Sequence, residues 1–281
     1  MKKVLSLLCA AGLTVSLAAC GSTGSTPSAT PEESTPVAEP VELNVFAAAS
    51  LTESLNEIQT LYTDVAPNVT LLFTTLASGT LQTQIEQGAD ADLFLSAGQN
   101  EMNALDATYA GTEFNPLGLD FILSNTRIDL LGNQLVLAVP AGNPAGITSF
   151  EDLITDRVTM LAIGAPASVP AGMYAQETLT ALGLWDTLNA ENKLTLASSV
   201  KEVTAQVTAG SVDAGIIYLT DANAADLEVV AIAPTDSHSP IVYPAAVLTN
   251  SHAPQAAEDF LAFLTGPEAT AVFESYGFSA P

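Results

Sequence analysis

Four short segments have the residue types that begin a helix, and each follows a β-rich run. They are Ser50-Leu51-Thr52-Glu53, Ser78-Gly79-Thr80, Pro170-Ala171-Gly172 and Ser199-Val200-Lys201-Glu202. The first and last have the spacing of a capping box, and proline suits the first turn of a helix. A helix start exposes unpaired backbone N–H groups and about half a positive charge, so anions bind there. We therefore predict an anion site where these helix starts meet.

The same serines would need a general base to act as nucleophiles in a hydrolase. The sequence holds two histidines, His238 and His252, and both stand in polar stretches typical of exposed loops. The sequence lacks the Gly-x-Ser-x-Gly motif of many hydrolases, and it lacks metal-ligand spacing of His, Cys and Asp. Asp90 and Asp92 could exchange protons, but Asp92 precedes an apolar run and is interpreted as structural. We expect no enzyme activity and no cofactor, with an exported hydrolase as the alternative.

The composition limits how an anion can be held. The 281 residues include 31 acidic and 6 basic side chains, for a formal charge of −25, and 48% are apolar. This length and apolar content suit one large or two medium domains with a sizeable core. A nucleic-acid partner is not expected, because no basic stripe is present to neutralise phosphates. Any anionic ligand must be bound by hydroxyl and N–H donors with little help from lysine or arginine.

The N-terminus has the pattern of an export signal. Lys2 and Lys3 precede an apolar run over residues 4–19, which is too short to span a bilayer. The run ends in Leu17-Ala18-Ala19-Cys20, which resembles the lipobox of bacterial lipoproteins. We predict a signal peptide at 1–19, lipidation of Cys20, and a flexible Ser/Thr/Pro-rich tether over 20–42. The protein would then be exported, and either anchored to the outer face of the cytoplasmic membrane or periplasmic.

From residue 43 onward, β-rich runs alternate with amphipathic ones, a pattern typical of an α/β fold with mainly parallel sheets. Strands are expected at 43–48, 69–74, 92–97, 135–139, 158–163, 194–197, 214–218, 229–232 and 241–248. Helices are expected at 51–62, 80–87, 150–154, 171–182, 200–209, 255–264 and 268–275. Open sheets of this kind bind ligands at the carboxyl ends of their strands, where the four helix starts lie.

Several of these stretches, in order along the chain, resemble one known family. They are FAAASLT (46–52), SGTL (78–81), QIEQGADADLFLSA (84–97), LGN (131–133), VPAGMYA (169–175), GIIY (215–218), DSH (236–238), YP (243–244) and YGF (276–278). In these places the sequence resembles the substrate-binding proteins of bacterial molybdate ABC transporters. The likeness covers residues 43–278. Gly79 departs from it, since the family often has serine there, and the stretch between Ala104 and Asp129 is longer than usual.

The resemblance implies a two-lobed periplasmic-binding-protein fold, close to type II, in which two crossover segments form the hinge. Lobe 1 would comprise residues 43–130 plus 241–281, and lobe 2 residues 131–240. The residues that it implies as contacts to the molybdate oxygens are Ser50, Ser78, Ala171, Val200 and Tyr218. The metal would be held only through its oxygens, with no direct bond to the protein.

The resemblance also implies partners. A monomer would capture molybdate, and also tungstate, and deliver it to a transporter permease with its cytoplasmic ATPase, while the lipid holds it at the membrane. Another tetrahedral oxyanion, such as sulfate or phosphate, stays open as the ligand because cavity size cannot be read from sequence. An adhesin or structural surface protein would fit the lipobox and tether but would leave the ordered motifs unexplained.

Overall fold

The computed structural model describes residues 39–281. The predicted signal peptide, Cys20 and the predicted tether up to residue 38 lie outside the described residues. The strand that follows begins at Val41, two residues earlier than expected, because the Val41 N–H donates to the Asn68 carbonyl (2.9 Å) and Val41 pairs with Val69. In the described part, no helix is both long and apolar enough to cross a membrane.

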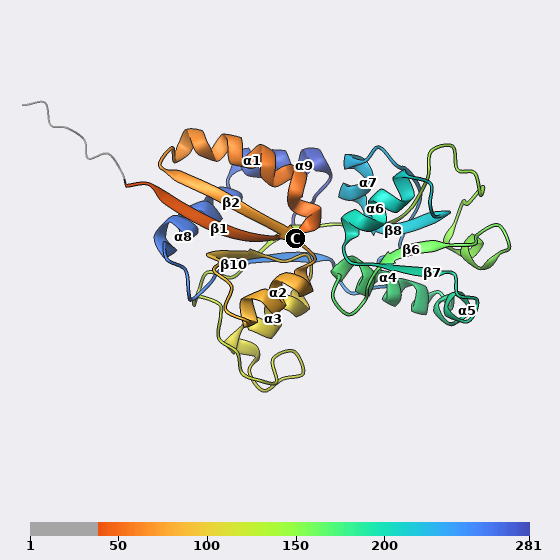
Figure 1. Ribbon diagram of the computed structural model, residues 1–281, viewed down its shortest axis with the longest axis horizontal. Coiled ribbons are helices and arrows are strands. Elements are labelled where there is room, and N and C mark those ends of the chain that lie inside the picture. Colours follow the sequence, from red (N-terminus) through yellow and green to blue (C-terminus); the bar gives the residue numbers. More distant parts are fainter. Residues whose placement is uncertain (1–38) are drawn as a thin grey trace, which may run out of the picture. The chain divides into compact units, whose positions relative to one another are not determined.

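One five-stranded sheet, with its helices, forms what we call lobe 1. Its strand order is β2-β1-β3-β10-β4. The strands are β1 (Val41–Ala48), β2 (Val69–Leu76), β3 (Leu93–Leu95), β4 (Ile128–Gly132) and β10 (Val242–Val247). The helical elements are η1 (Ala49–Leu51), α1 (Thr52–Val65), α2 (Ser78–Glu86), α3 (Gln99–Leu105), η2 (Ala107–Tyr109), α8 (Pro254–Leu264) and α9 (Pro267–Tyr276). Figure 1 shows α1 and α9 on one face of this sheet and α2 with α3 on the other.

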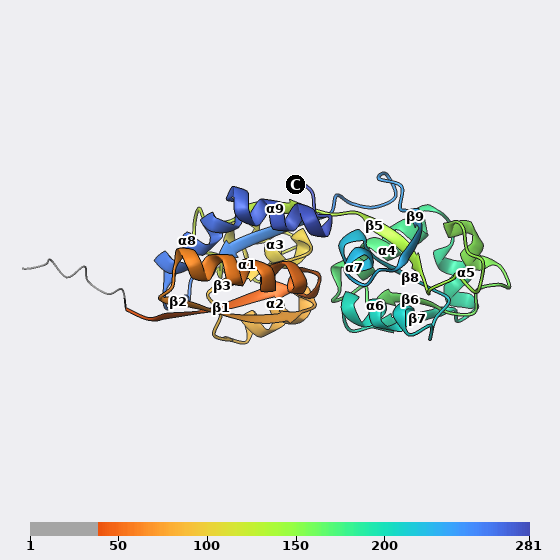
Figure 2. The same ribbon diagram turned by 90° about the horizontal axis from the view of Figure 1, so that it is seen from above.

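A second five-stranded sheet forms lobe 2, with the strand order β7-β6-β8-β5-β9. Its strands are β5 (Leu135–Val139), β6 (Leu161–Gly164), β7 (Leu194–Ala197), β8 (Ala214–Tyr218) and β9 (Glu228–Ile232). Its helical elements are η3 (Phe150–Ile154), α4 (Pro170–Ala181), α5 (Trp185–Ala190), α6 (Val200–Thr208) and α7 (Leu219–Ala224). Figure 2 shows the two lobes from above, with their sheets separate.

The sheets are mainly parallel, as expected, but each contains one reversed strand, which makes it a mixed sheet. In lobe 1, β1 is parallel to β2 and β3, whereas β10 is antiparallel to β3 and β4. Lobe 2 has the same pattern, with β5 antiparallel to β8 and β9. The cause is the chain path. β10 and β5 each come directly from the other lobe, so they enter their sheet at the carboxyl ends of the parallel strands. They therefore run in the opposite direction.

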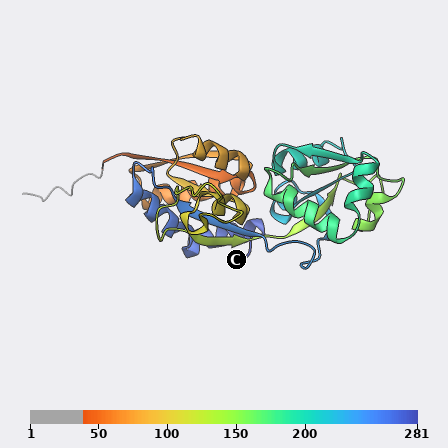
Figure 3. The same ribbon diagram turned by 90° about the horizontal axis from the view of Figure 1, so that it is seen from below.

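Two segments carry the chain between the lobes and run side by side (Figure 3). The first joins β4 to β5, and the second joins β9 to β10. They are held together by the pairing of Val242 with Gly132 and of Tyr243 with Leu131. Gly132 also exchanges two backbone hydrogen bonds with Ser279 (2.8 and 3.0 Å). The C-terminal residues are therefore bonded to the end of β4, where the first segment begins.

The helices of lobe 1 pack as their sequence periodicity predicts. Leu55 and Ile58 of α1 are buried, as are Leu81 and Ile85 of α2. Gly88, just after α2, has a φ of +84°, a conformation that favours glycine and ends the helix.

The stretch between Ala104 and Asp129, which we expected to be longer than usual, forms η2 and an irregular loop in lobe 1. The loop is held by the buried side chain of Asn115. Its amide donates to the carbonyls of Asp106 (3.0 Å) and Leu119 (2.8 Å), and its oxygen accepts from the Leu119 N–H (2.8 Å). A buried asparagine that is satisfied in this way gives an irregular loop a defined shape.

Candidate functional site

The carboxyl ends of six parallel strands, three from each lobe, face one another across the boundary between the lobes. In lobe 1, Ala48 at the end of β1 pairs with Leu76 at the end of β2. Ser50 lies two residues beyond Ala48, and Ser78 lies two residues beyond Leu76. The two serines are therefore equally far along the chain from the end of the sheet. In lobe 2, Gly164 of β6 pairs with Ala197 of β7, and helices α4 and α6 begin just beyond. The register of the strands therefore sets where the candidate residues lie.

All five residues expected to contact the ligand line one small cavity between the lobes. The space open to the centre of a water-sized molecule is about 10 Å³, about the room that a single water needs. The lining residues are Ala48, Ala49, Ser50, Ala77, Ser78, Ala97, Val169, Pro170, Ala171, Val200 and Tyr218. No lining residue has a charged side chain. A ligand in this cavity would therefore meet hydroxyl and backbone groups and no charged side chain.

Ser50 and Ser78 do not cap helices. Ser50 lies inside η1, its side chain makes no capping bond, and its hydroxyl is 2.9 Å from the Tyr243 hydroxyl. The expected capping box with Glu53 is wrong, because η1 precedes α1 and places Ser50 two residues before the helix. Ser78 is the first residue of α2, and its Oγ accepts a hydrogen bond from the Ala97 N–H (3.0 Å). Both hydroxyls are thus free of their own helices and lie at the cavity.

The lobe 2 helix starts are as expected from sequence, with one change. Pro170 is the first residue of α4, and Ser199 caps α6 by accepting from the Glu202 N–H (3.2 Å). A capping box would have the Glu202 carboxylate accept from the N–H of Ser199. It accepts instead from the N–H and hydroxyl of the preceding residue, Ser198 (both 2.7 Å). The N–H groups of Ala171 and Val200 lie in first turns, where the helix offers them no acceptor.

A glycine brings α4 close to its strand. A Cβ atom at Gly172 would lie 2.1 Å from the carbonyl oxygen of Gly164 in β6. Only glycine allows the first turn of α4 to sit directly on the end of β6. This contact fixes the neighbouring N–H of Ala171 at the cavity.

Tyr218 ends β8 and reaches across to lobe 1. Its side chain is buried, and its hydroxyl donates to the carbonyl of Ala97 (3.2 Å). Burial raises the pKa of Tyr218 well above its usual value, with Tyr243, Tyr174 and nearby acids adding to the effect. The hydroxyl therefore stays protonated and acts as a donor at neutral pH.

The cation nearest the candidate site is already paired. The Lys201 ammonium lies 2.6 Å from Glu53 in lobe 1 and 2.9 Å from Asp221 in lobe 2. Burial alone would lower the pKa of Lys201, but Asp221 and Glu53 outweigh it and raise that pKa. Lys201 thus joins the lobes beside Val200, and two carboxylates neutralise its charge.

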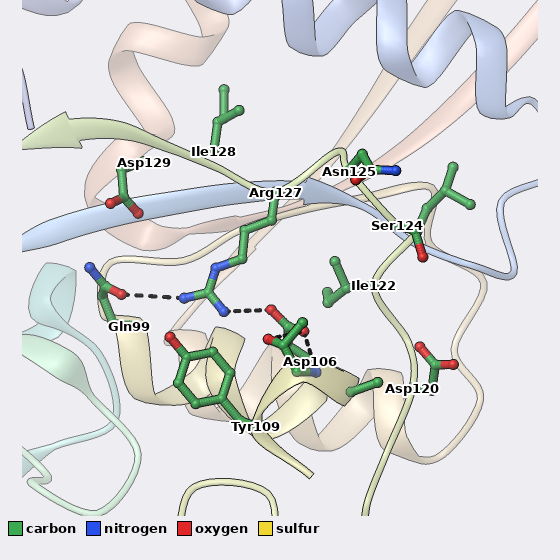
Figure 4. A pocket seen from close by; sticks show the side chains of 13 residues that line it. Gln99, Asp106, Tyr109, Asp120, Ile122, Ser124, Asn125, Arg127, Ile128 and Asp129 are labelled. Carbon is green, nitrogen blue, oxygen red and sulfur yellow. Dashed lines mark hydrogen bonds and ion pairs between the residues drawn. The ribbon is translucent and has the colours of Figure 1, made fainter.

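A larger cavity, of about 540 Å³, lies within lobe 1 beside the long loop (Figure 4). Arg127 is its cation, and its guanidinium donates to Asp106 (2.7 Å), Asn103 (2.6 Å) and Gln99 (3.3 Å). Burial would raise the pKa of Asp106, but Thr108 and Arg127 hold it below its usual value. Because Arg127, the cation that lines this cavity, is held by Asp106, Asn103 and Gln99, we interpret the cavity as structural.

Within residues 39–281, no hydrogen bond joins either histidine to Ser50 or Ser78. His238 contacts the Ser239 carbonyl (2.8 Å), and His252 is largely exposed beside Asp90 (3.5 Å). Asp92 is structural as expected, since it accepts from the Asn44 N–H (2.8 Å) and the Ser251 hydroxyl (2.6 Å). Among residues 39–281, no three His, Cys, Asp or Glu side chains gather as a metal site would need.

Sequence reasoning assigned no role to several residues at this site. Ala97 uses both its N–H and its carbonyl here, and Tyr243 holds Ser50. Tyr243 belongs to one of the stretches that carry the family resemblance, but it is distant from Ser50 in sequence. Only pairing of β10 next to β3 brings it near.

Comparison with known proteins agrees with this architecture. The family model for bacterial extracellular solute-binding proteins matches residues 43–279. The chain belongs to this family. Among relatives of this solute-binding protein, a putative ABC transporter substrate-binding lipoprotein, YvgL of Bacillus subtilis, is 38% identical over 85% of this chain and 87% of its own. The molybdate-binding protein ModA of Haemophilus influenzae is 36% identical over 85% of this chain and 90% of its own.

One solved structure is also similar to this solute-binding protein in sequence. It is the substrate-binding domain of a putative molybdenum ABC transporter from Clostridium difficile. It is 41% identical, with a TM-score of 0.64, over 86% of this chain and 99% of that domain. The two-lobed fold with helices on both faces of each sheet is therefore the fold of the family.

Proposed function

We propose that this solute-binding protein captures molybdate, and also tungstate, between its lobes and delivers it to an ABC transporter permease. The observation that carries the proposal is the small cavity at which Ser50, Ser78, Ala171, Val200 and Tyr218 meet. Relatives that cover most of the chain bear the name molybdate-binding protein, which supports the choice of ligand.

The cavity suits the chemistry of this ion. Molybdate at neutral pH is a dianion without a proton, so its site needs donors only. The cavity offers the Ser50 and Ser78 hydroxyls and first-turn N–H groups, and hydrogen bonds to a charged acceptor contribute about 1.5–3 kcal/mol each. Hydrogen phosphate would bring a proton that needs an acceptor, which disfavours it. Sulfate has the same charge and shape but is smaller, so cavity size must separate the two.

The sequence of the N-terminus and the family support one route of delivery. In this proposal, export is followed by lipidation of Cys20, and the monomer works at the outer face of the membrane. The relative YvgL bears the name of a lipoprotein, which supports the anchor. The permease and its cytoplasmic ATPase would then receive the ion. No cofactor is part of the proposal, because the ligand is held by the protein alone.

Calorimetry on the exported chain with molybdate, tungstate, sulfate and phosphate tests the choice of ligand. We expect tight binding of molybdate and tungstate and weak or absent binding of the other two. Sulfate bound as tightly as molybdate would overturn the ligand assignment. A hydrolase would instead show turnover, whereas a binding protein shows only a rise in melting temperature with molybdate.

Two substitutions test the site itself. Ser50→Ala and Ser78→Ala should each weaken molybdate binding by about 1.5–3 kcal/mol, or roughly 10- to 150-fold. Ser211→Ala is the matched control, because Ser211 is exposed in lobe 2 and bonds only within its own turn. Wild-type affinity in both site variants would mean that the anion binds elsewhere.

A further inference from the structure

A chain of hydrogen bonds runs from the hinge to Ser50. It starts at Asn133, in the segment that joins β4 to β5. The Gln134 N–H donates to Asn133 Oδ1 (2.8 Å), and this bond fixes which end of the amide is oxygen. Asn133 Nδ2 therefore faces the other way, within 3.1 Å of the Tyr243 hydroxyl and 3.0 Å of the Thr220 hydroxyl. An amide NH₂ group can only donate, so the Tyr243 oxygen accepts from Asn133.

The next hydrogen bond joins the hydroxyls of Tyr243 and Ser50, and Tyr243 is its donor. The Tyr243 side chain is fully buried, and the hydrogen bonds of its hydroxyl within residues 39–281 are those with Asn133 and Ser50. Because its oxygen already accepts from Asn133, its O–H is left to donate to Ser50 Oγ at 2.9 Å. Burial also raises the pKa of Tyr243 well above its usual value, so this proton stays in place at neutral pH.

The last member of the chain is Ser50 itself. Its oxygen accepts from Tyr243, and its own O–H is therefore free to point into the cavity that it lines. The Ser78 hydroxyl is also left to donate, because its Oγ accepts a hydrogen bond from the Ala97 N–H. The two serines thus have an acceptor position filled by the protein and a donor left for the ligand.

We propose that Asn133 and Tyr243 are positioning residues that keep Ser50 as a donor toward the bound oxyanion. This role rests on the proposed function, and it explains why the Ser50 hydroxyl donates to the ligand rather than accepting from it. With Tyr243 in place, Ser50 Oγ has less capacity to accept a proton from a protonated anion such as hydrogen phosphate. Asn133 lies in the first crossover segment and Tyr243 at the start of β10, where the second one ends, so the preference for a fully deprotonated ion is set beside the hinge.

A double-mutant cycle between Tyr243 and Ser50 tests this. Tyr243→Phe keeps the ring, which packs on Tyr218 and Phe278 with centroids 5.7 and 5.4 Å apart, and removes only the hydroxyl. We expect Tyr243→Phe to weaken molybdate binding roughly 3- to 10-fold in the wild type. In the Ser50→Ala background the same change should cost less than about 2-fold, because Tyr243 acts through Ser50. A merely structural role would give equal losses in both backgrounds.

Tyr174→Phe is the matched control. Tyr174 is also buried, its ring lies 6.5 Å from that of Tyr218, and its hydroxyl has only a long contact with the Pro240 carbonyl (3.5 Å). Its effect on affinity should be below 2-fold and independent of Ser50. Equal losses for Tyr243→Phe with and without Ser50, or no loss in the wild type, would overturn the inference.

The same experiment separates this inference from the proposed function. If the wild type binds another oxyanion of the panel instead of molybdate, the proposed ligand fails and the cycle is measured with that ion. If Ser50→Ala has no effect, the site is wrong and the inference fails with it. If Ser50→Ala weakens binding and the cycle is additive, the site stands and only the positioning role is overturned.

Discussion

The backbone N–H of Gly79 donates a hydrogen bond to the carbonyl oxygen of Ser168, with 3.1 Å between nitrogen and oxygen. This bond joins helix α2 of lobe 1 to the loop before α4 in lobe 2. A Cβ atom at position 79 would lie 2.7 Å from that oxygen and 2.9 Å from the Ser168 Cα, so the two backbones touch directly. The absence of a side chain at Gly79 therefore sets how closely the lobes approach beside Ser78.

Gly79→Ala should weaken oxyanion binding without weakening the fold. The Cβ would meet backbone of the other lobe, so the lobes could not reach this separation, and we expect affinity to fall at least about 10-fold, or roughly 1.4 kcal/mol. Alanine is better than glycine in a helix by up to about 1 kcal/mol, so the ligand-free melting temperature should not fall. Calorimetry and thermal unfolding measure the two effects.

The control for this change is Thr83→Ala, which also favours helix formation in α2 but lies on its exposed side and bonds only to the Gly79 carbonyl of the same helix. It should leave affinity unchanged. Unaltered affinity in Gly79→Ala would show that the lobes close without this contact.

Lys201→Met should destabilise the protein strongly, because it would leave Asp221 buried without a cation. Asp221 is fully buried, and Lys201 is its ion-pair partner. Removing one partner of a buried pair costs about 3–5 kcal/mol. Urea unfolding at pH 7 measures the loss. In the Asp221→Asn background the same change should cost far less, since no charge is then stranded.

Arg157→Met provides the comparison for Lys201→Met. The Arg157 side chain is half exposed and pairs with Asp152, and such surface pairs contribute about 0–1 kcal/mol. A loss in Lys201→Met as small as that in Arg157→Met would mean that Asp221 is solvated in solution.

Glu101 should make the stability of the protein depend on pH. Its side chain is 8% exposed, and within the described part of the chain one of its carboxylate oxygens has no hydrogen-bond partner. Burial raises its pKa from 4.5 to about 7 and outweighs its own backbone N–H, which lowers the pKa. The folded state thus holds a proton that the unfolded state has released between these two pH values. Stability from this group is present below about pH 4.5 and is lost as pH rises to about 7.

Glu101→Gln should remove this loss. Above pH 7 the variant should be more stable than the wild type by up to roughly 3 kcal/mol, the free energy of a shift of about 2.5 pKa units. Chemical unfolding between pH 4.5 and 8 measures the difference, with Glu274→Gln as the control because Glu274 is exposed. Parallel pH profiles for Glu101→Gln and wild type would contradict a buried, ionising Glu101.

Local sequence patterns were enough to foresee most elements of the fold. Periodicity identified the inward faces of α1 and α2, and Gly88 marked the end of α2. Proline at the start of α4 and Ser199 at the start of α6 were legible because caps act over a few residues. The reversed strands β10 and β5 were not foreseen, because their direction depends on where the chain enters each sheet.

By itself, the sequence determined which donors were available and that each follows the carboxyl end of a strand. It also determined, through composition, that an anion must be held without free cations. Only the tertiary structure decided how those donors are used. Tyr243 reaches Ser50 through β10, Lys201 is shared between Glu53 and Asp221, and Gly79 touches Ser168. The reason is physical: hydrogen-bond polarity, charge pairing and backbone approach depend on which distant segments meet, and local propensities carry no information on that.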